Sequence, residues 1–477
     1  MKTVLKNCNI LTATNVFIGD ILLEEGIIKE VGTDISCAGC EVVNVNGKYV
    51  LPGGVDQHVH FSFEYNGSKV RGFETSNAAA IGGTTTVIEF INQIKGKGLV
   101  ESIEEYIKDQ VEGVAMVDYS FHSVMTDPRE EVIEEIPSLA DKGYPTMKMF
   151  MAYKGMFFHS DDDAILKALL KGKKSGVTIM VHAENADMID VLQKKLILEG
   201  KTGPYSHVLS RPPIVEAEAT KRAIYLADLA EAPIYIVHVS CRDALEEIVN
   251  SYSKGSYVYG ETCSHYLTLD ESNLDKPDFE GAKYVCSPAL RSKEHRDAMW
   301  EGIQKGWLNV VSSDHCGFDW KKQKHMGIDS FTNIPNGAPG LENRLAILWT
   351  YGVEQNKITK QKLVELFSTN PAKINGISHR KGDIAPGYDA DLVVFDPSWE
   401  GIISNENSLQ GVDYNPYEGM KQIGRVEKVF LRGNLIVDDA KYIGSQGDGE
   451  LIKGKPYGMC YDEINIDEKL QNENAFA

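Results

Sequence analysis

The sequence predicts an α/β protein: a (β/α)8 TIM barrel with a small β-sandwich domain formed by the N- and C-terminal segments. Eight apolar, strand-like runs follow one another through the middle of the chain, and amphipathic helical stretches separate most of them. Strands that alternate with helices are typical of a parallel sheet, and eight such units fit a closed barrel. Shorter β-like segments with glycine turns occupy both ends. No glycine-rich nucleotide-binding motif favours an open, doubly wound sheet.

The elements are read from the periodicity of apolar residues and from the turn residues between them. The strand-like runs of the barrel cover residues 55–61, 84–91, 117–125, 146–153, 177–183, 234–240, 258–267 and 308–315. The clearest helical stretches cover residues 99–110, 164–174, 216–230 and 293–305. The β-like segments cover residues 4–11, 20–24, 27–31 and 48–51 near the start, and 390–396, 426–431 and 434–437 near the end.

These changes of pattern divide the chain into four parts. Residues 1–51 are the N-terminal part of the β-sandwich, 52–374 the barrel, 375–447 the C-terminal part of the sandwich and 448–477 a tail that ends in a polar, acidic run. Because chain termini are often close in space, we expect the two β-rich parts to pair into one domain. The tail is expected on the surface or against a neighbouring subunit.

Composition excludes several classes of function. The chain has 477 residues and a formal net charge of −20, and so strongly acidic a surface disfavours nucleic-acid binding. No apolar stretch is long enough to span a membrane, and the N-terminus lacks the apolar core of a signal peptide. Eight scattered cysteines do not suggest a disulfide framework and predict a reducing, cytoplasmic location. The one C-x-x-C, Cys37 with Cys40, is interpreted as surface or structural.

The histidine pair in Asp56-Gln57-His58-Val59-His60 is the first candidate for a functional site. Side chains two apart in a strand point to the same side, so His58 and His60 project together at the C-terminal end of the first barrel strand. Active sites of such barrels lie at that end. Two adjacent imidazoles suit a divalent metal, although two hydrogen-bonded core histidines would give the same pattern.

Three more metal-capable residues close later strand-like runs. His182 ends the run Thr-Ile-Met-Val-His, His238 ends Ile-Tyr-Ile-Val-His, and Asp314 ends Val-Val-Ser-Ser-Asp. Each one alone would more often be a core or capping residue. Together with the first histidine pair they are hard to explain by core packing, and they predict a metal site.

Lys148 lies within the apolar run Thr-Met-Lys-Met-Phe-Met-Ala-Tyr. A buried lysine is costly unless it is neutral or paired, and burial lowers its pKa toward a neutral, nucleophilic amine. Such an amine can add carbon dioxide to give a carbamate, an anion with two oxygens that can bridge two metal ions. A snorkelling lysine is the alternative, but beside four histidines and an aspartate the bridge explains Lys148 better.

These motifs resemble the amidohydrolase superfamily, and most closely its dihydropyrimidinase and hydantoinase group. Nearly the whole chain takes part in the resemblance, and the motifs are specific as a set. They are D-x-H-x-H at 56–60, A-A-A-I-G-G-T-T-T at 78–86, D-Y-S-F-H at 118–122, K-M-F-M-A-Y-K-G at 148–155, V-H-A-E at 181–184, I-V-H-V-S at 236–240, S-P-A-L-R at 287–291, S-S-D-H-C-G-F at 312–318, I-P-N-G-A-P-G at 334–340, T-N-P-A-K at 369–373 and G-Y-D-A-D-L-V-V at 387–394.

The resemblance implies a centre of two divalent metal ions per subunit, usually zinc. In such a centre His58 and His60, with Asp314, bind the more buried ion, and His182 and His238 bind the other. Lys148, modified by carbon dioxide to N6-carboxylysine, bridges the two. The resemblance also implies a homotetramer.

The implied reaction is hydrolysis of a cyclic amide bond by a metal-bridging hydroxide. A 5,6-dihydropyrimidine or a 5-substituted hydantoin opens to an N-carbamoyl amino acid. Asp314 acts first as general base and then as general acid, and Tyr153 donates to the developing oxyanion. Backbone groups of Ser287 and Asn336 hold the ring imide. From spacing alone Tyr153 is a packing residue at a strand end, and Ser287 and Asn336 are turn residues.

The chain departs from the pattern of the group at the pocket border. Arg71-Gly72-Phe73-Glu74 replaces the usual acidic pair before Phe-Glu, Glu89 stands where Asp is commoner, and the loop 62–70 contains Phe63 and Tyr65. Because of these differences, the sequence does not determine the side group of the substrate or the stereopreference. It does not determine the identity of the metal either.

Two alternatives remain. An allantoinase or dihydroorotase usually carries an arginine-bearing loop after the first histidine pair, where this chain has Phe-Ser-Phe-Glu at 61–64. A non-catalytic scaffold homologue lacks several ligands, whereas all six ligand positions are filled here.

Overall fold

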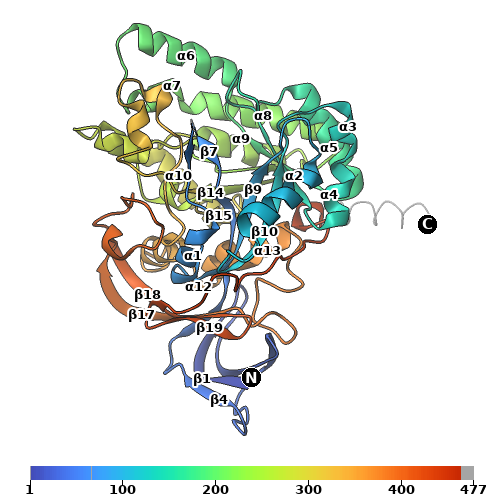
Figure 1. Ribbon diagram of the computed structural model, residues 1–477, viewed down its shortest axis with the longest axis vertical. Helices are drawn as coiled ribbons and strands as arrows, with labels where there is room; N and C mark the ends of the chain where they lie inside the picture. The colour runs from blue at the N-terminus through green and yellow to red at the C-terminus, as the bar shows by residue number, and fades with distance from the viewer. Residues whose placement is uncertain (1, 66, 463–477) are drawn as a thin grey trace, which may run out of the picture.

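The computed structural model describes residues 2–65 and 67–462. A barrel with its helices makes up one end of the molecule and a β-domain the other (Figure 1). Both chain ends contribute to the β-domain, whose N-terminal and C-terminal strands lie side by side although they are far apart in sequence. No helix in the described part of the chain is long and apolar enough to cross a membrane.

Eight parallel strands form the barrel, as the sequence predicts. They pair in chain order: β6 (Gly54–His60), β9 (Thr84–Asn92), β10 (Asp118–Val124), β11 (Thr146–Phe150), β12 (Thr178–His182), β13 (Ile234–Ile236), β14 (Val258–Cys263) and β15 (Val310–Ser312). The barrel closes through β16 (His315–Cys316), which follows β15 after two residues and pairs in parallel with β6, His315 opposite Val59. The strand ends therefore form a ring.

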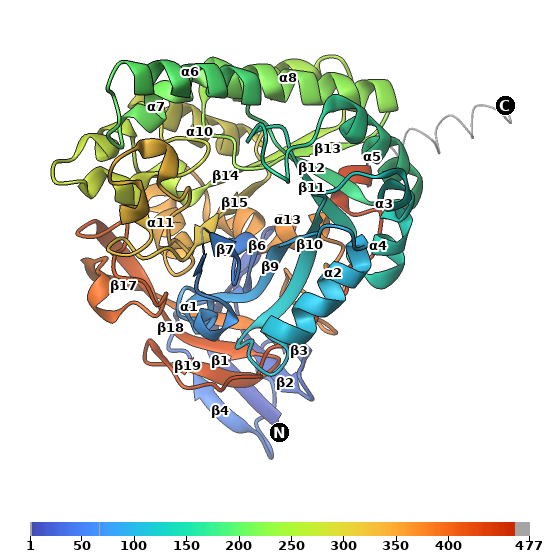
Figure 2. The ribbon, with the colours of Figure 1, turned by 45° about the horizontal axis from the view of Figure 1, so that its top comes forward.

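Helices cover the outside of the barrel, and α6 and α8 run along its outer edge (Figure 2). The longer ones are α2 (Leu99–Tyr106), α5 (Asp162–Ser175), α6 (Ala186–Leu198), α8 (Pro213–Ala230), α9 (Arg242–Tyr252) and α10 (Lys293–Lys305). The shorter ones are α1 (Asn77–Ile81), α3 (Glu130–Glu134), α4 (Ile136–Lys142), α7 (Ser206–Ser210), α11 (Arg344–Ile347), α12 (Lys360–Val364) and α13 (Asn370–Ile374). Local signals set their ends: the Asp161 side chain accepts from Ala164 N at the start of α5, and Gly176, at φ 75°, ends it.

The β-domain is one continuous nine-stranded sheet. Its strands are β1 (Lys2–Leu11), β2 (Val16–Glu24), β3 (Ile27–Gly32), β4 (Glu41–Asn44), β5 (Tyr49–Pro52), β17 (Leu392–Ile402), β18 (Lys421–Leu431), β19 (Asn434–Asp438) and β20 (Lys441–Tyr442). The two chain ends join where β5 pairs antiparallel with β17, Val50 opposite Val394. A separate apolar core within this domain includes Ile10, Ile21 and Leu392. The pairing of the two ends agrees with the sequence prediction.

A buried ionic network joins the barrel to the β-domain. Lys381 is 1% exposed, and its ammonium donates to Asp118 at the start of β10 (2.5 Å) and to Asp391 just before β17 (2.7 Å). It also lies 2.8 Å from Asp389, and Arg432 of the β-domain binds the other oxygen of Asp118. This network lies at the N-terminal end of β10, away from the strand ends that carry the predicted ligands.

The first part of the C-terminal tail packs against the barrel. Tyr119 N donates to Glu450 O (3.1 Å), Ile452 N donates to Tyr119 O (2.8 Å), and Cys460 and Tyr461 are buried. The expected surface position is therefore wrong for Ile452, Cys460 and Tyr461, which pack into apolar clusters with residues of the barrel strands, whereas Glu450 is exposed. The acidic run from residue 463 onward lies outside the described residues.

Candidate metal centre and active site

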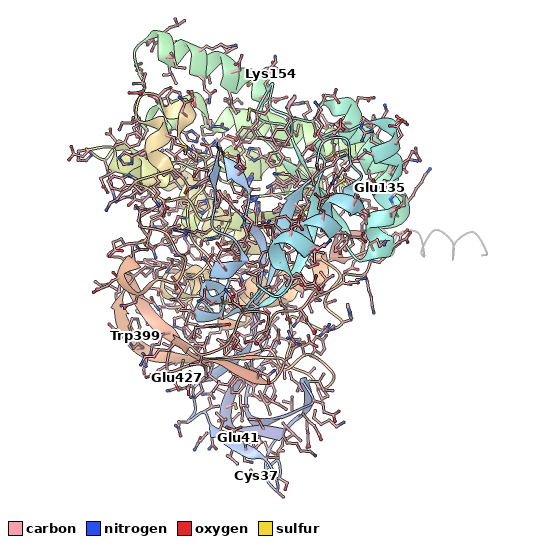
Figure 3. The ribbon with its side chains drawn as sticks, in the orientation of Figure 1. Cys37, Glu41, Glu135, Lys154, Trp399 and Glu427 are labelled. Atoms are coloured by element: carbon pink, nitrogen blue, oxygen red, sulfur yellow. The ribbon has the colours of Figure 1, made fainter. Side chains whose placement is uncertain are left out.

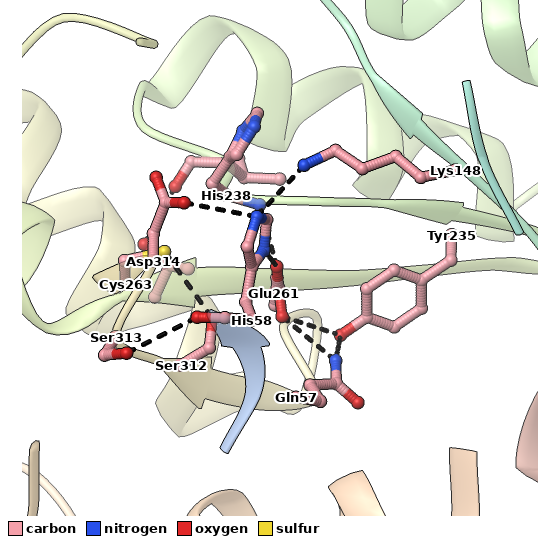
Figure 4. A network of polar contacts seen from close by, with 12 residues as sticks. Gln57, His58, Lys148, Tyr235, His238, Glu261, Cys263, Ser312, Ser313 and Asp314 are labelled. Atoms are coloured by element: carbon pink, nitrogen blue, oxygen red, sulfur yellow. Dashed lines mark hydrogen bonds and ion pairs between the residues drawn. The ribbon is translucent and has the colours of Figure 1, made fainter. Parts of the chain in front are cut away.

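The predicted ligands meet at the C-terminal ends of the barrel strands (Figure 4). His58 Nε2 lies 3.0 Å from Lys148 Nζ and 3.2 Å from an Asp314 carboxylate oxygen. The same oxygen lies 3.4 Å from His60 Nε2. These residues come from β6, β11 and the break between β15 and β16, so barrel closure itself brings them together.

The other two histidines complete the cluster. The ring centroids of His182 and His238 are 4.5 Å apart, and those of His58 and His238 are 5.3 Å apart. His182 ends β12, and His238 follows β13. All six predicted ligands therefore form one contiguous group.

The cluster fits a divalent metal centre. His58, His60 and Asp314 each offer a ligand atom within 4.8 Å of the others. The buried Nδ1 of His238 has no hydrogen-bond partner in the described structure, as expected of a ring nitrogen that is free to bind a metal ion. Imidazole nitrogen and carboxylate oxygen are the donors that zinc and related divalent ions use.

Burial favours the neutral form of the nitrogen bases of this site. It lowers the pKa of Lys148 to about 8, although Asp314 and Glu261 oppose the shift. It also lowers the pKa of His58 and of His238 well below the ordinary value. A neutral imidazole has a lone pair for a metal, and a neutral amine can react with carbon dioxide.

Sequence reasoning missed the residues that orient His58. The His58 Nδ1 donates to the buried carboxylate of Glu261, which leaves Nε2 facing Lys148 and Asp314. Gln57 holds the other oxygen of Glu261 at 2.9 Å. A second-layer carboxylate of this kind sets the tautomer of a metal-ligating histidine. The available signal was an acidic residue in the middle of an apolar strand.

A second carboxylate orients His182 in the same way. His182 Nε2 lies 2.7 Å from Glu184, and Arg211 approaches the same carboxylate oxygen at 2.6 Å. Although burial opposes it, the Arg211 guanidinium lowers the pKa of Glu184 to about 2. Glu184 is therefore an anion that accepts from His182, and Nδ1 is left to face the cluster. The V-H-A-E motif contained this residue but gave it no role.

The backbone is strained at three site residues. Tyr153, His238 and Asp314 have φ of 62°, 39° and 49°, values that non-glycine residues rarely adopt. Each follows a barrel strand. Strain of this kind persists where the surroundings hold the backbone and is concentrated at functional sites.

The predicted substrate-binding residues border the cluster. The Asn336 side-chain nitrogen lies 3.5 Å from the Tyr153 hydroxyl, and the rings of Tyr153 and His182 are 5.5 Å apart. Ser287 is 8% exposed. It lies two residues after Val285, whose carbonyl oxygen accepts a hydrogen bond from Gly337 N. Burial raises the pKa of Tyr153, against the effect of Arg211, so its phenol stays a proton donor.

The Cys37–Cys40 segment takes no part in this site. Cys37 lies at the outer tip of the β-domain, at the opposite end of the molecule from Lys154, which follows Tyr153 (Figure 3). Both cysteines are free.

Comparison with known proteins shows similarity over nearly the whole chain. The profile of the amidohydrolase family matches residues 49–436. The D-hydantoinase of Geobacillus stearothermophilus is 44% identical over 469 residues, which are 98% of this chain and 99% of that protein. The D-hydantoinase of Ralstonia pickettii is 43% identical and covers 96% of this chain and 100% of its own.

A solved structure agrees with these relatives. The dihydropyrimidinase from Brevibacillus agri NCHU1002 superposes with a TM-score of 0.94 at 41% identity, covering 96% of this chain and 100% of that one. With a family match over most of its length and relatives this similar, the chain belongs to the amidohydrolase family.

Proposed function

We propose that the protein hydrolyses the cyclic amide bond of 5-substituted hydantoins and 5,6-dihydropyrimidines to give N-carbamoyl amino acids. The observation that carries this is the meeting of four histidines, Lys148 and Asp314 at one barrel mouth. Solved structures named dihydropyrimidinase and D-hydantoinase share the fold of this chain over their full length.

Two divalent ions, zinc in this proposal, would be held by His58, His60 and Asp314 on one side and by His182 and His238 on the other. Lys148 would supply an anionic ligand to both as a carbamate: its neutral amine would form an N–C bond to carbon dioxide and release a proton to solvent. When bound, such ions polarise a carbonyl and make water a nucleophile near neutral pH.

The side chains of this protein manage the protons and the orientation of the ring. Asp314 accepts a proton from the attacking water and passes it to the ring nitrogen that leaves. Although burial opposes it, the hydrogen bond from His60 lowers the pKa of Asp314, so the carboxylate is ready as a base. Tyr153 donates its hydroxyl hydrogen to the carbonyl oxygen as charge develops there. Backbone groups of Ser287 and Asn336 hold the ring imide.

A substrate panel tests the proposed function. It contains dihydrouracil, dihydrothymine, aryl and alkyl hydantoins of both hands, allantoin and dihydroorotate. We expect ring opening of the dihydropyrimidines or hydantoins, and the panel reads the side-group preference and the stereopreference directly. Turnover of only allantoin or dihydroorotate would assign a sibling activity, and no turnover by metal-loaded protein would indicate a scaffold.

We also propose a homotetramer located in the cytoplasm. The outer helices α6 and α8 expose Val191 (65%), Leu198 (89%) and Leu229 (71%), apolar area that a subunit contact would cover. Light scattering should then give about four times the chain mass of 52.9 kDa. All eight cysteines are free, which suits a reducing compartment.

A further inference from the structure

Lys324 is a fully buried lysine that has no part in the proposed reaction. It begins the short turn η6 (Lys324–Gly327) and has no exposed surface. Among the described residues it has no carboxylate within ion-pair distance. Its Nζ instead donates to three backbone carbonyls, those of Val285 (2.8 Å), Pro335 (2.7 Å) and Gly337 (2.5 Å).

The three acceptors belong to the two turns that carry Ser287 and Asn336. Val285 is two residues before Ser287, and Pro335 and Gly337 are the two neighbours of Asn336. Gly337 N also donates to Val285 O (3.0 Å), so one carbonyl receives both contacts. A Cβ on Gly337 would lie 2.6 Å from the Cβ of Cys316, so this close approach requires a glycine. Lys324 therefore joins two turns that are about 50 residues apart in the chain.

Three carbonyl acceptors match the three N–H groups of an ammonium. Burial lowers the pKa of Lys324 to about 7, against the opposing effect of the Cys316 and Cys286 thiols. Burial of this lysine costs desolvation free energy, and all three of its N–H donors bind backbone carbonyls. Lys324 therefore does more than fill space.

The residue before Lys324 extends the same link to a third loop. The Gln323 side-chain nitrogen donates to Ser68 Oγ and Lys69 O, both at 3.1 Å, on strand β8 (Ser68–Lys69) of the hairpin it forms with β7 (Glu64–Tyr65). Gln323 Oε1 in turn accepts from Asp319 N at 2.7 Å. The segment 323–324 is thus tied to three loops that border the barrel mouth.

We propose that Lys324 is a positioning residue for the substrate ring: by holding Val285, Pro335 and Gly337 it fixes the relative placement of the Ser287 and Asn336 backbone groups. The proposal rests on the proposed function, in which those groups bind the ring imide. It assigns Lys324 no contact with substrate or metal. Its loss therefore weakens binding of the ring and leaves the metal centre intact.

The test compares Lys324→Met with the wild type and with Tyr461→Phe in metal-loaded, full-length protein. The Tyr461 hydroxyl is also buried and lies 2.9 Å and 2.8 Å from the carbonyls of Gly172 and Val177, at the other end of the barrel. Tyr461→Phe is thus a matched loss of a donor to backbone. With dihydrouracil we expect Lys324→Met to raise KM at least about tenfold with kcat changed less than about threefold. Metal content should equal that of the wild type, and Tyr461→Phe should leave KM unchanged.

Hydrogen exchange separates the positioning role from the proposed function. Peptides covering residues 285–288 and 335–337 should exchange faster in Lys324→Met and unchanged in Tyr461→Phe. If the wild type opens no cyclic amide, the proposed function fails, and this exchange still decides whether Lys324 holds the turns. An unchanged KM, an equal KM rise in Tyr461→Phe, or unchanged exchange in Lys324→Met would overturn the proposal.

Two further measurements cover a variant that fails to fold. Lys324→Gln retains two N–H donors on a shorter side chain. Its KM should therefore rise, but less than that of Lys324→Met. In the wild type, the Gly337 amide should exchange as slowly as amides of the barrel strands. Exchange at the rate of an exposed loop would contradict the proposal without any variant.

Discussion

Lys148 and Glu261 are ionisable residues in apolar barrel strands, and both are buried beside His58. Lys148 lies 3.0 Å from His58 Nε2, and Glu261 binds the opposite nitrogen of the same ring. At the scale of single residues the site is therefore organised around His58. Each contact makes a separate prediction.

Replacing Lys148 with alanine removes the proposed bridging anion. We expect Lys148→Ala to lose most of its bound metal and to lower kcat by at least about a thousandfold, since a positioned catalytic group contributes 10²–10⁴. Elemental analysis and turnover of the best panel substrate measure the two effects. Lys171, which is half-buried and pairs with Glu134 away from the site, serves as the control when replaced in the same way. Full activity in Lys148→Ala would refute the bridging role.

Replacing Glu261 with glutamine keeps the shape of the side chain and removes its charge. The His58 ring then loses the carboxyl group that fixes its tautomer, and we expect metal affinity to fall roughly 10–100-fold. Titration with a competing chelator measures this affinity. Glu342→Gln is the matched control, because Glu342 is half-buried and contacts Ser408 and Leu409 but no predicted ligand. Equal affinity in both variants would contradict the role given to Glu261.

At the scale of elements, the strands were predictable and their ends were not. Apolar runs located all eight barrel strands, but β13 stops at Ile236, before His238, and β15 stops at Ser312, before Asp314. The backbone turns to positive φ at His238 and Asp314, and periodicity carries no information on such a turn. Strand β4 was missed because its residues, Glu41–Asn44, are mostly exposed and polar at both ends.

One loop contact makes a prediction about pH. Burial raises the pKa of Glu342 to about 7, while Leu409 N and the Ser408 hydroxyl donate to its carboxyl. Between pH 4.5, the ordinary pKa of a glutamate, and about pH 7, Glu342 binds more protons in the folded state than in the unfolded chain. The stability that its protonated form contributes is therefore lost as pH rises through that window.

Glutamine at position 342 cannot titrate. The melting temperature of Glu342→Gln minus that of the wild type should therefore increase as pH rises from about 5 to 8. Thermal unfolding at several pH values measures this difference. A difference that stays constant with pH would show that Glu342 does not hold a proton in the folded state.

At the scale of the whole molecule, the net charge of −20 says little about the substrate, and the pairing of charges says more about the fold. The ligand set was predictable because strand ends of a closed barrel share one rim. The second layer, Glu184 with Arg211 and Glu261 with Gln57, was not, because its members meet only through the curvature of the barrel. The domain boundaries near residues 51 and 374 remain our proposal.

The ionic network between barrel and β-domain predicts a large effect on stability. Lys381→Met leaves Asp118, Asp389 and Asp391 without their shared ammonium. We expect the free energy of unfolding to fall by about 3–5 kcal/mol, as for other broken buried pairs. Lys142→Met, which breaks an exposed pair with Glu104, should cost less than about 1 kcal/mol. Chemical denaturation measures both, and equal losses would refute the structural role of the network.

If a metal centre at the barrel mouth opens cyclic amides, activity must follow metal content. Ring opening of dihydrouracil and a 5-substituted hydantoin is therefore measured with one protein sample before metal removal, after removal and after reloading with zinc and bicarbonate. We expect turnover to disappear with the metal and to return when about two ions per chain are restored. Undiminished turnover by metal-free protein, or none by protein holding two ions, would contradict this expectation.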